Sequence, residues 1–211
     1  MNHFTIRPAR PDDQAGAYYV CLKTGDHGRD GESFYQDDPD ALGRIFVGPY
    51  IEFEPQLSLI LEDAEGVCGY ALAALDSRSF YERYEHEWRP RLCQEFPMPG
   101  GAPSTWTRAE TVHSWYHRPD YFCPEPYEQY PSHMHIDLLE RARGQGVGRR
   151  MMEQQMVKLR ELGSPGAHLA VSVRNAAALG FYASLGFQEL TRTGTADDGN
   201  ILLGKHWTSI S

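Results

Sequence analysis

The stretch "HIDLLERARGQGVGRRMMEQQM", residues 135–156, contains the clearest change of pattern in the chain. An apolar run ends in charged residues, three glycines follow within five positions, and an amphipathic segment then begins. Glycine is costly in ordered structure unless the backbone needs unusual dihedral angles or a ligand must come close. The stretch therefore predicts a strand, a ligand-binding turn at Gly144, Gly146 and Gly148, and a helix.

The position of these glycines at the start of a helix indicates an anion site. Backbone N–H groups at a helix N-terminus are unpaired and carry partial positive charge, so they bind anions, and glycines let a phosphate approach them. A dinucleotide loop would need glycine where Arg149 stands, and a P-loop would need Gly-Lys-Ser/Thr, which is missing. What remains is R-x-x-G-x-G, formed by Arg143, Gly146 and Gly148. The alternative is that the glycines only turn the chain.

The rest of the chain predicts strands and helices in mixed order. Asp12 and Asp13 are candidate N-caps of the first helix, and Gly25 and Gly163 are helix stops. The turn at 63–66 indicates a hairpin. The order indicates a mixed sheet with helices on its faces, in one domain over residues 1–211. We expect strands at 4–9, 56–63, 66–76, 133–139, 167–173, 188–193 and 200–206, and helices at 10–25, 37–53, 147–162 and 175–186.

Residues 76–131 form a long insertion between the third and fourth strands. The segment is rich in aromatic residues, is broken by prolines, and contains two stretches of helical pattern, 79–92 and 107–117. A connection of this length is usually a functional lid or an embellishment with its own packing. The two interpretations are an aromatic core of its own and a wall of the substrate site.

Composition excludes several function classes. The net charge of −9 argues against binding to a nucleic-acid backbone and is compatible with a cationic substrate. The four cysteines are scattered without metal-ligand spacing, so we expect free thiols and no metal site. No stretch has the length of a membrane span, and the first residues lack a signal-peptide core, so we expect a cytoplasmic protein that does not bind membranes.

A second motif follows the glycine loop. In "VRNAAALGFYASLGF", residues 173–187, the pattern N-x-x-A-x-x-x-Y-x-x-x-G-F includes Asn175 and Tyr182. Together with R-x-x-G-x-G, it resembles the GCN5-related N-acetyltransferases (GNAT). The resemblance implies an α/β fold with about seven strands flanked by helices. It also implies acetyl-coenzyme A (acetyl-CoA) as cofactor and an amine, not identified by the sequence, as acceptor.

The resemblance also implies roles for residues of both motifs. The backbone of the fourth strand would pair with the pantetheine arm, and the glycine loop would hold the pyrophosphate. Arg143, Arg149 and Arg150 would neutralise phosphates, or would simply begin a solvated helix. The cofactor-binding residues expected on this basis are Ile136, Asp137, Leu138, Arg143, Gly144, Gln145, Gly146, Val147, Gly148, Arg149, Asn175 and Tyr182.

The implied chemistry is attack of a primary amine on a thioester. Such an amine has a pKa of about 10.4, so a base or a water chain should take its proton. Tyr182 would protonate the leaving thiolate, although an aromatic residue there could also simply pack between helix and sheet. Asp137, His135 and His133 alternate along the fourth strand and share one face, so each is a candidate base. His117 in the insertion is a further candidate.

A narrower resemblance suggests a competing hypothesis. Residues 4–21, 61–76 and the segment around Trp88 and Pro90 resemble the acetyltransferase-like carboxy-terminal domain of eukaryotic O-GlcNAcase. The glycine loop is intact here, which implies a bacterial-type relative that still binds the cofactor. The competing hypothesis is a catalytically inactive recognition module that binds acetyl-CoA.

Overall fold

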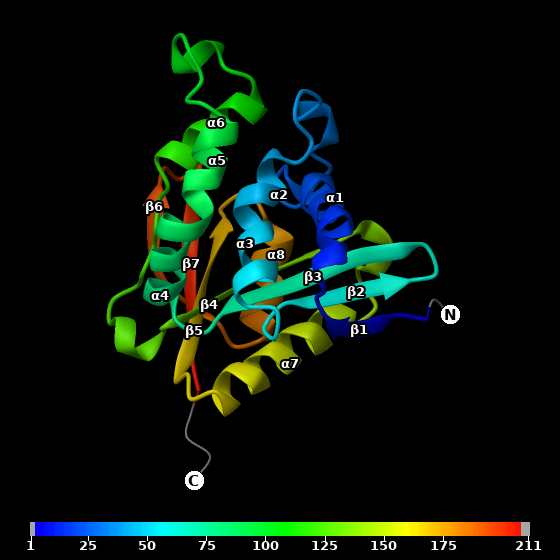
Figure 1. Ribbon diagram of the computed structural model, residues 1–211. Coiled ribbons are helices and arrows are strands. Elements are labelled where there is room, and N and C mark those ends of the chain that lie inside the picture. The colour runs from blue at the N-terminus through cyan, green and yellow to red at the C-terminus, as the bar shows by residue number, and fades with distance from the viewer. Residues whose placement is uncertain (1–2, 208–211) are drawn as a thin grey trace.

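One mixed sheet runs through the computed structural model, which describes residues 3–207 (Figure 1). Its strands are β1 (Thr5–Pro8), β2 (Leu59–Asp63), β3 (Gly66–Ala74), β4 (Ser132–Leu138), β5 (Gly166–Ser172), β6 (Gln188–Gly194) and β7 (Gly199–His206). The spatial order is β1-β2-β3-β4-β5-β7-β6, and only the β4–β5 pair is parallel. The expected seven-stranded α/β fold is confirmed.

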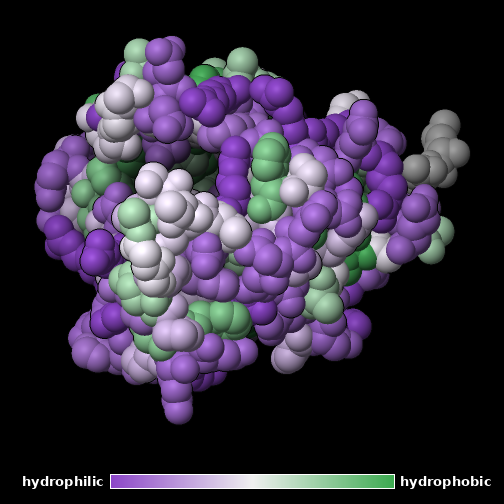
Figure 2. Space-filling model, turned by 90° about the horizontal axis from the view of Figure 1, so that it is seen from above, coloured by the Kyte–Doolittle hydropathy of each residue, from purple (hydrophilic) through white to green (hydrophobic). Residues whose placement is uncertain are grey.

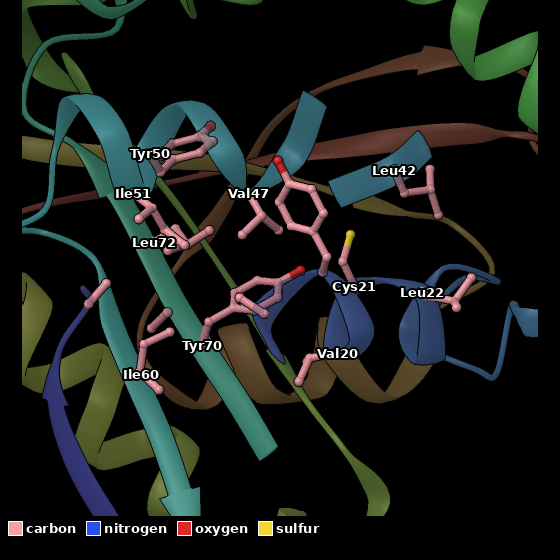
Figure 3. Close-up of a cluster of buried hydrophobic side chains, with 14 of the residues drawn as sticks. Val20, Cys21, Leu22, Leu42, Val47, Tyr50, Ile51, Ile60, Tyr70 and Leu72 are labelled. Carbon is pink, nitrogen blue, oxygen red and sulfur yellow. The ribbon is translucent and has the colours of Figure 1, made fainter. Parts of the chain in front are cut away.

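Helices cover both faces of the sheet. They are α1 (Gln14–Thr24), α2 (Ala41–Phe46), α3 (Gly48–Phe53), α4 (Ser77–Arg83), α5 (Arg89–Glu95), α6 (Arg108–His117), α7 (Val147–Glu161) and α8 (Ala176–Ser184). α1 and α3 pack on the face of β3 that carries Tyr70 and Leu72, where apolar side chains from helices and strands meet, and α2 packs against α1 (Figure 3). α7 and α8 pack on the other face, against Met134 of β4.

The predicted helix over 37–53 is in fact two helices. α2 ends at Phe46, and α3 begins at Gly48 after Val47 leaves helical geometry at φ −127°. Pro49 explains the break, because proline has no N–H to continue a helix and its ring clashes with the preceding turn. α3 packs on β3, whereas α2 packs against α1 and α6.

Asp13 occupies the N-cap position of α1, as predicted, but its side chain makes no capping hydrogen bond. Its carboxylate does not cap α1 but accepts two hydrogen bonds from the guanidinium of Arg7, at 2.6 and 2.7 Å. The Arg10 N–H also donates to this carboxylate, at 2.7 Å. A charged donor on the neighbouring strand offers the carboxylate a stronger bond than the helix N–H groups do.

The parallel strands β4 and β5 separate soon after they begin. They are in register only at Ser132–Ala167 and His133–His168. From Met134 onward, β4 remains paired with β3 alone. The divergence opens a gap in the middle of the sheet, just before the glycine loop that follows β4.

The insertion is helical, as predicted, and much of it is core. α4, a π-helical turn at Tyr84–Trp88 and α5 follow each other without a break. Trp88 donates through Nε1 to the carbonyl of Arg44, and the buried Tyr116 donates to the carbonyl of Ala41 at 2.6 Å.

The surface seen from above in Figure 2 is mainly hydrophilic, with hydrophobic residues only in small groups. Within residues 3–207, every helix is too short or too polar to cross a bilayer.

Candidate active site

A cavity of about 450 Å³ opens where β4 and β5 diverge, beside the start of α7. It is bounded by the end of β4, the glycine loop, one side of α8 and the loop after α1. The lining residues are Gly28, Ile136, Asp137, Leu138, Ala142, Arg143, Gly144, Gly146, Gly148, Arg149, Asn175, Ala177, Ala178, Phe181 and Tyr182. The structure therefore gathers residues that are up to 154 positions apart in the sequence (182 − 28) around one space.

The glycine loop has the geometry of an anion cradle. Gly144 and Gly146 have φ of +71° and +73°, and a Cβ at either would meet no atom within 4 Å. Glycine is needed at these positions for the left-handed backbone and not to avoid a clash. Gly148 differs, because a Cβ there would lie 3.0 Å from Cδ1 of Leu138, so glycine allows α7 to start close to β4. The N-terminus of this 15-residue helix therefore faces open space.

Two arginines flank the loop and are held by neighbouring groups. Arg143 donates to the carbonyl of Leu138 and to that of Gly28, both at 2.8 Å, so it ties β4 to the loop after α1. Arg149 donates to Ser184 Oγ at 2.8 Å. These contacts hold positive charge at the mouth of the cavity, and this donor set fits a phosphate-bearing group.

Asn175 and Tyr182 of the second motif lie on the opposite side of the cavity. Asn175 caps α8 by accepting from the N–H of Ala178 at 3.1 Å. Tyr182 is buried, and burial raises the pKa of its phenol, while a hydrogen bond with the backbone of Ile136 opposes that rise. The phenol is therefore protonated at neutral pH and lies next to the middle of β4.

Asp137 reaches the cavity from the other face of the sheet. Tyr70 of β3 donates to its Oδ2 at 2.7 Å. Burial raises the pKa of Asp137 to about 6, while hydrogen bonds from Tyr70 and Thr24 and the charge of Arg143 oppose the rise. A carboxylate with this pKa is ionised at pH 7 and still able to accept a proton.

The histidine candidates do not line this cavity. His133 lies on the same face as Asp137, as predicted, but Tyr50 hydrogen bonds to its Nε2 at 2.8 Å and Ser77 to its Nδ1 at 2.7 Å. His135 packs edge-on against Tyr50, and burial lowers the pKa of its imidazole to about 4. His117 is hydrogen bonded to the carbonyl of Phe96 at 2.8 Å.

Ten of the twelve expected cofactor residues line the cavity, and the side chains of two do not. Gln145 donates back to the carbonyl of Arg141, and Val147 is buried in the core. Sequence reasoning missed Gly28, Ala142, Ala177, Ala178 and Phe181 as lining residues. Ala178 could have been found, because it lies four positions before Tyr182 and shares its face of α8. Nothing in the sequence pointed to Gly28.

The insertion does not line this cavity with any of its described residues. Tyr116 of α6 is fully buried core, in line with the first of the two interpretations of the insertion. Tyr81 instead stacks on His133, with ring centroids 5.2 Å apart, and Phe122 packs against His168 at 6.0 Å. This part of the insertion therefore covers the point where β4 and β5 begin to separate.

A second cavity, of about 550 Å³, lies between β2 and the middle of α7. Leu57, Gln155 and Lys158 are among its lining residues, and none of the predicted site residues is. The chemistry expected from the motifs therefore belongs to the cavity beside the glycine loop.

Comparisons with known proteins agree with this geometry. The profile of the Acetyltransferase (GNAT) domain matches residues 121–189. The crystal structure of SsHAT is 35% identical with a TM-score of 0.86, covering 96% of this chain and 98% of that one. The YncA protein of Salmonella typhimurium, whose structure contains acetyl-CoA, is 14% identical with a TM-score of 0.55, over 96% of this chain and 93% of that one.

A curated relative is much longer than this chain. Protein O-GlcNAcase of Mus musculus is 29% identical over 204 residues, which is 96% of this chain but 22% of that protein. The fold defines an acetyltransferase-type domain with a cavity beside its diverging central strands. The chain belongs to the GCN5-related N-acetyltransferase family.

Proposed function

We propose that this protein is an acetyl-CoA-dependent N-acetyltransferase that acts on a primary amine of a small molecule, a peptide or a protein lysine. The observation that supports it most is that one cavity borders the glycine loop, Tyr182 and Asp137 together. The acidic chain, with net charge −9, suits an acceptor that carries positive charge before it reacts.

The residues present fit the cofactor. The open N-terminus of α7 offers unpaired N–H groups, and the positive-φ glycines leave room above them. Gly144, Gly146 and Gly148 would hold the pyrophosphate, and Arg143 and Arg149 would balance its charge. The edge of β4 from Ile136 to Leu138, which β5 leaves free, would pair with the pantetheine arm. Acetyl-CoA would supply the acetyl group as a thioester.

Asp137 and Tyr182 divide the proton transfers. Asp137 would accept the proton that the amine nitrogen loses as it attacks, and its raised pKa suits a base that works near neutral pH. Tyr182 would donate its phenolic proton to the departing sulfur. They enter the cavity from opposite faces of the sheet, so base and acid act on opposite sides of the reacting carbon.

The loop assignment is tested by Gly146→Asp. A carboxylate at the start of α7 should repel a pyrophosphate, at a cost of about 1 kcal/mol in water and about 4 kcal/mol near a protein surface. We expect the Kd for coenzyme A, measured by calorimetry, to rise at least about fivefold.

Gly163→Asp is the matched control. Gly163 ends the same helix with φ +91°, and a Cβ there also meets nothing within 4 Å, so strain and added charge are alike. Its Kd should equal that of the wild type. An unchanged Kd in Gly146→Asp would show that the loop does not bind the cofactor.

The alternative is a module that binds acetyl-CoA without turnover. One observation favours it: two candidate bases, Asp137 and His133, already hydrogen bond to groups of their own chain. Measuring thiol release from acetyl-CoA with a broad panel of amines and peptides distinguishes the active enzyme from the inactive module. Coenzyme A binding with no turnover on any acceptor would favour the inactive module.

A further inference from the structure

Tyr70 is a buried tyrosine whose hydroxyl points at the candidate base. It faces Asp137 across the β3–β4 pair, and its side chain is fully buried. Figure 3 shows its ring among the apolar residues beneath α1 and α3. The hydroxyl donates to Oδ2 of Asp137 at 2.7 Å. A buried hydroxyl that bonds a carboxylate makes a charge-assisted hydrogen bond, stronger than a neutral one.

The groups that face Asp137 come from each element packed around it. Thr24 of α1 lies beside it and helps to lower its pKa, and the Arg143 guanidinium adds positive charge from the glycine loop. Tyr182 of α8 is close enough for the negative charge of Asp137 to help raise the pKa of its phenol. Behind Tyr70, the thiol of Cys21 lies next to the hydroxyl and is itself kept protonated by burial. Tyr70 is therefore the donor that holds Oδ2 of this carboxylate.

We propose that Tyr70 is a positioning residue for acetyl transfer: its hydroxyl holds Oδ2 of Asp137 toward β3, and Oδ1 is left to receive the proton of the attacking amine. The inference rests on the proposed function and adds a residue to it. The hydrogen bond also stabilises the ionised carboxylate against the cost of burial. Without it, Asp137 would be protonated over a wider pH range and would rotate freely.

The test is Tyr70→Phe, which removes the hydroxyl and keeps the ring. Loss of a donor to the carboxylate raises the pKa of Asp137 above about 6. We therefore expect the acid limb of the kcat/KM–pH profile to move up by about one unit. At pH 6 this lowers kcat/KM by about fivefold, approaching about tenfold at lower pH, and the Kd for coenzyme A stays unchanged.

Tyr50→Phe is the matched control. Tyr50 is also a buried tyrosine on this side of the sheet, and its hydroxyl bonds a β4 side chain, but that side chain is His133. Its acid limb should coincide with that of the wild type. An equal shift in both variants, or no shift in a folded Tyr70→Phe, overturns the proposal.

A second measurement does not need turnover. The carboxyl carbon of Asp137, assigned with Asp137→Asn, can be titrated by NMR in protein free of coenzyme A. A higher carboxyl pKa in Tyr70→Phe supports the proposal, and an unshifted one overturns it. If the wild type acetylates no acceptor, the proposed activity fails, while this titration still decides whether Tyr70 controls Asp137.

Discussion

At the scale of single residues, tertiary contacts separate three side chains that the sequence could not. His133, His135 and Asp137 alternate on one strand, so periodicity alone makes each of them an equally good candidate base. His133 has hydrogen-bond partners on both ring nitrogens, and His135 lies outside the cavity with an imidazole that is neutral at pH 7. Asp137 alone of the three borders the cavity and carries a pKa in the useful range.

Asp137→Asn should separate stability from activity. Asp137 has a folded-state pKa of about 6, above its ordinary 3.8, so the folded protein binds this proton more tightly than the unfolded chain. The free energy of unfolding of the wild type therefore falls as pH rises from about 4 to about 6. The variant has no carboxylate to ionise, so its free energy of unfolding does not fall in this way. The Tm of the variant minus the Tm of the wild type should therefore increase from pH 4 to pH 6 and keep the larger value at pH 8.

Activity of the same variant should fall by about 100-fold or more, the usual effect of removing a general base. The Kd for coenzyme A serves as the control and should not change. Turnover within about threefold of the wild type would remove Asp137 from the chemistry.

At the scale of elements, an ion-pair network joins β1, α1 and β2. Arg7 binds Asp13 through two hydrogen bonds and also binds Glu62 at 2.7 and 3.0 Å. The side chains of Arg7 and Asp13 are 17% and 7% exposed, so water screens this pair weakly. The network attaches the edge strand β1 to the start of α1, and α1 in turn supplies Thr24 to the surroundings of Asp137.

Asp13→Asn should destabilise the fold by about 1–3 kcal/mol, because a nearly buried guanidinium loses a charged acceptor. The hydrogen bond from Arg7 lowers the pKa of Asp13 below its ordinary 3.8. The stabilisation is thus complete above about pH 4 and is lost as pH falls through the folded-state pKa. In urea unfolding, the free energy of unfolding of the variant should differ strongly from that of the wild type at pH 7. At pH 3 the difference should be small. Equal differences at both values would argue against the ion pair.

At the scale of the whole molecule, hydrogen bonds join the two ends of the insertion, and the insertion packs against the helices on one face of the sheet. Ser77 at its start donates from N and from Oγ to the carbonyl of Pro131, both at 2.8 Å. Ser132 donates to the carbonyl of Leu75 at 2.6 Å. We propose that residues 1–211 form a single domain. We also propose that the insertion, with its ends joined in this way, acts as a lid on the acceptor side of that domain.

Two neighbouring aromatic residues test the lid. Tyr116→Ala removes a fully buried ring and should cost about 3–5 kcal/mol in folding. Trp115 is 39% exposed and meets Phe46 with ring centroids 6.4 Å apart, so Trp115→Ala should fold normally. If the lid borders the acceptor, this variant should raise the acceptor KM at least about threefold and leave the Kd for coenzyme A unchanged.

Trp106→Ala is the control within the insertion. Trp106 donates to the carbonyl of Gly100 at the tip, between α5 and α6, and should leave kinetics unchanged. An acceptor KM in Trp115→Ala equal to that of the wild type would favour a self-packed cap.

The sequence by itself determined where most helices and strands of this protein lie, because local chemistry sets them. The strands and the helices α1, α7 and α8 fell where periodicity and stop signals placed them, and α8 begins after Asn175, where its motif starts. The glycine loop was also readable, because left-handed backbone at Gly144 and Gly146 depends on the residue type. Such signals act within one or two helical turns, so a single sequence contains them in full.

Only the tertiary structure decided which of these residues act together. The gap beside β4 exists because β5 leaves its register after His168, and no residue type encodes that divergence. Gly28 joined the cavity through a contact with Arg143 that lies 115 positions away, and Tyr116 proved to be core although its neighbour Trp115 is exposed. The pKa of Asp137 likewise results from burial and from donors on β3 and α1, which meet only in the folded chain.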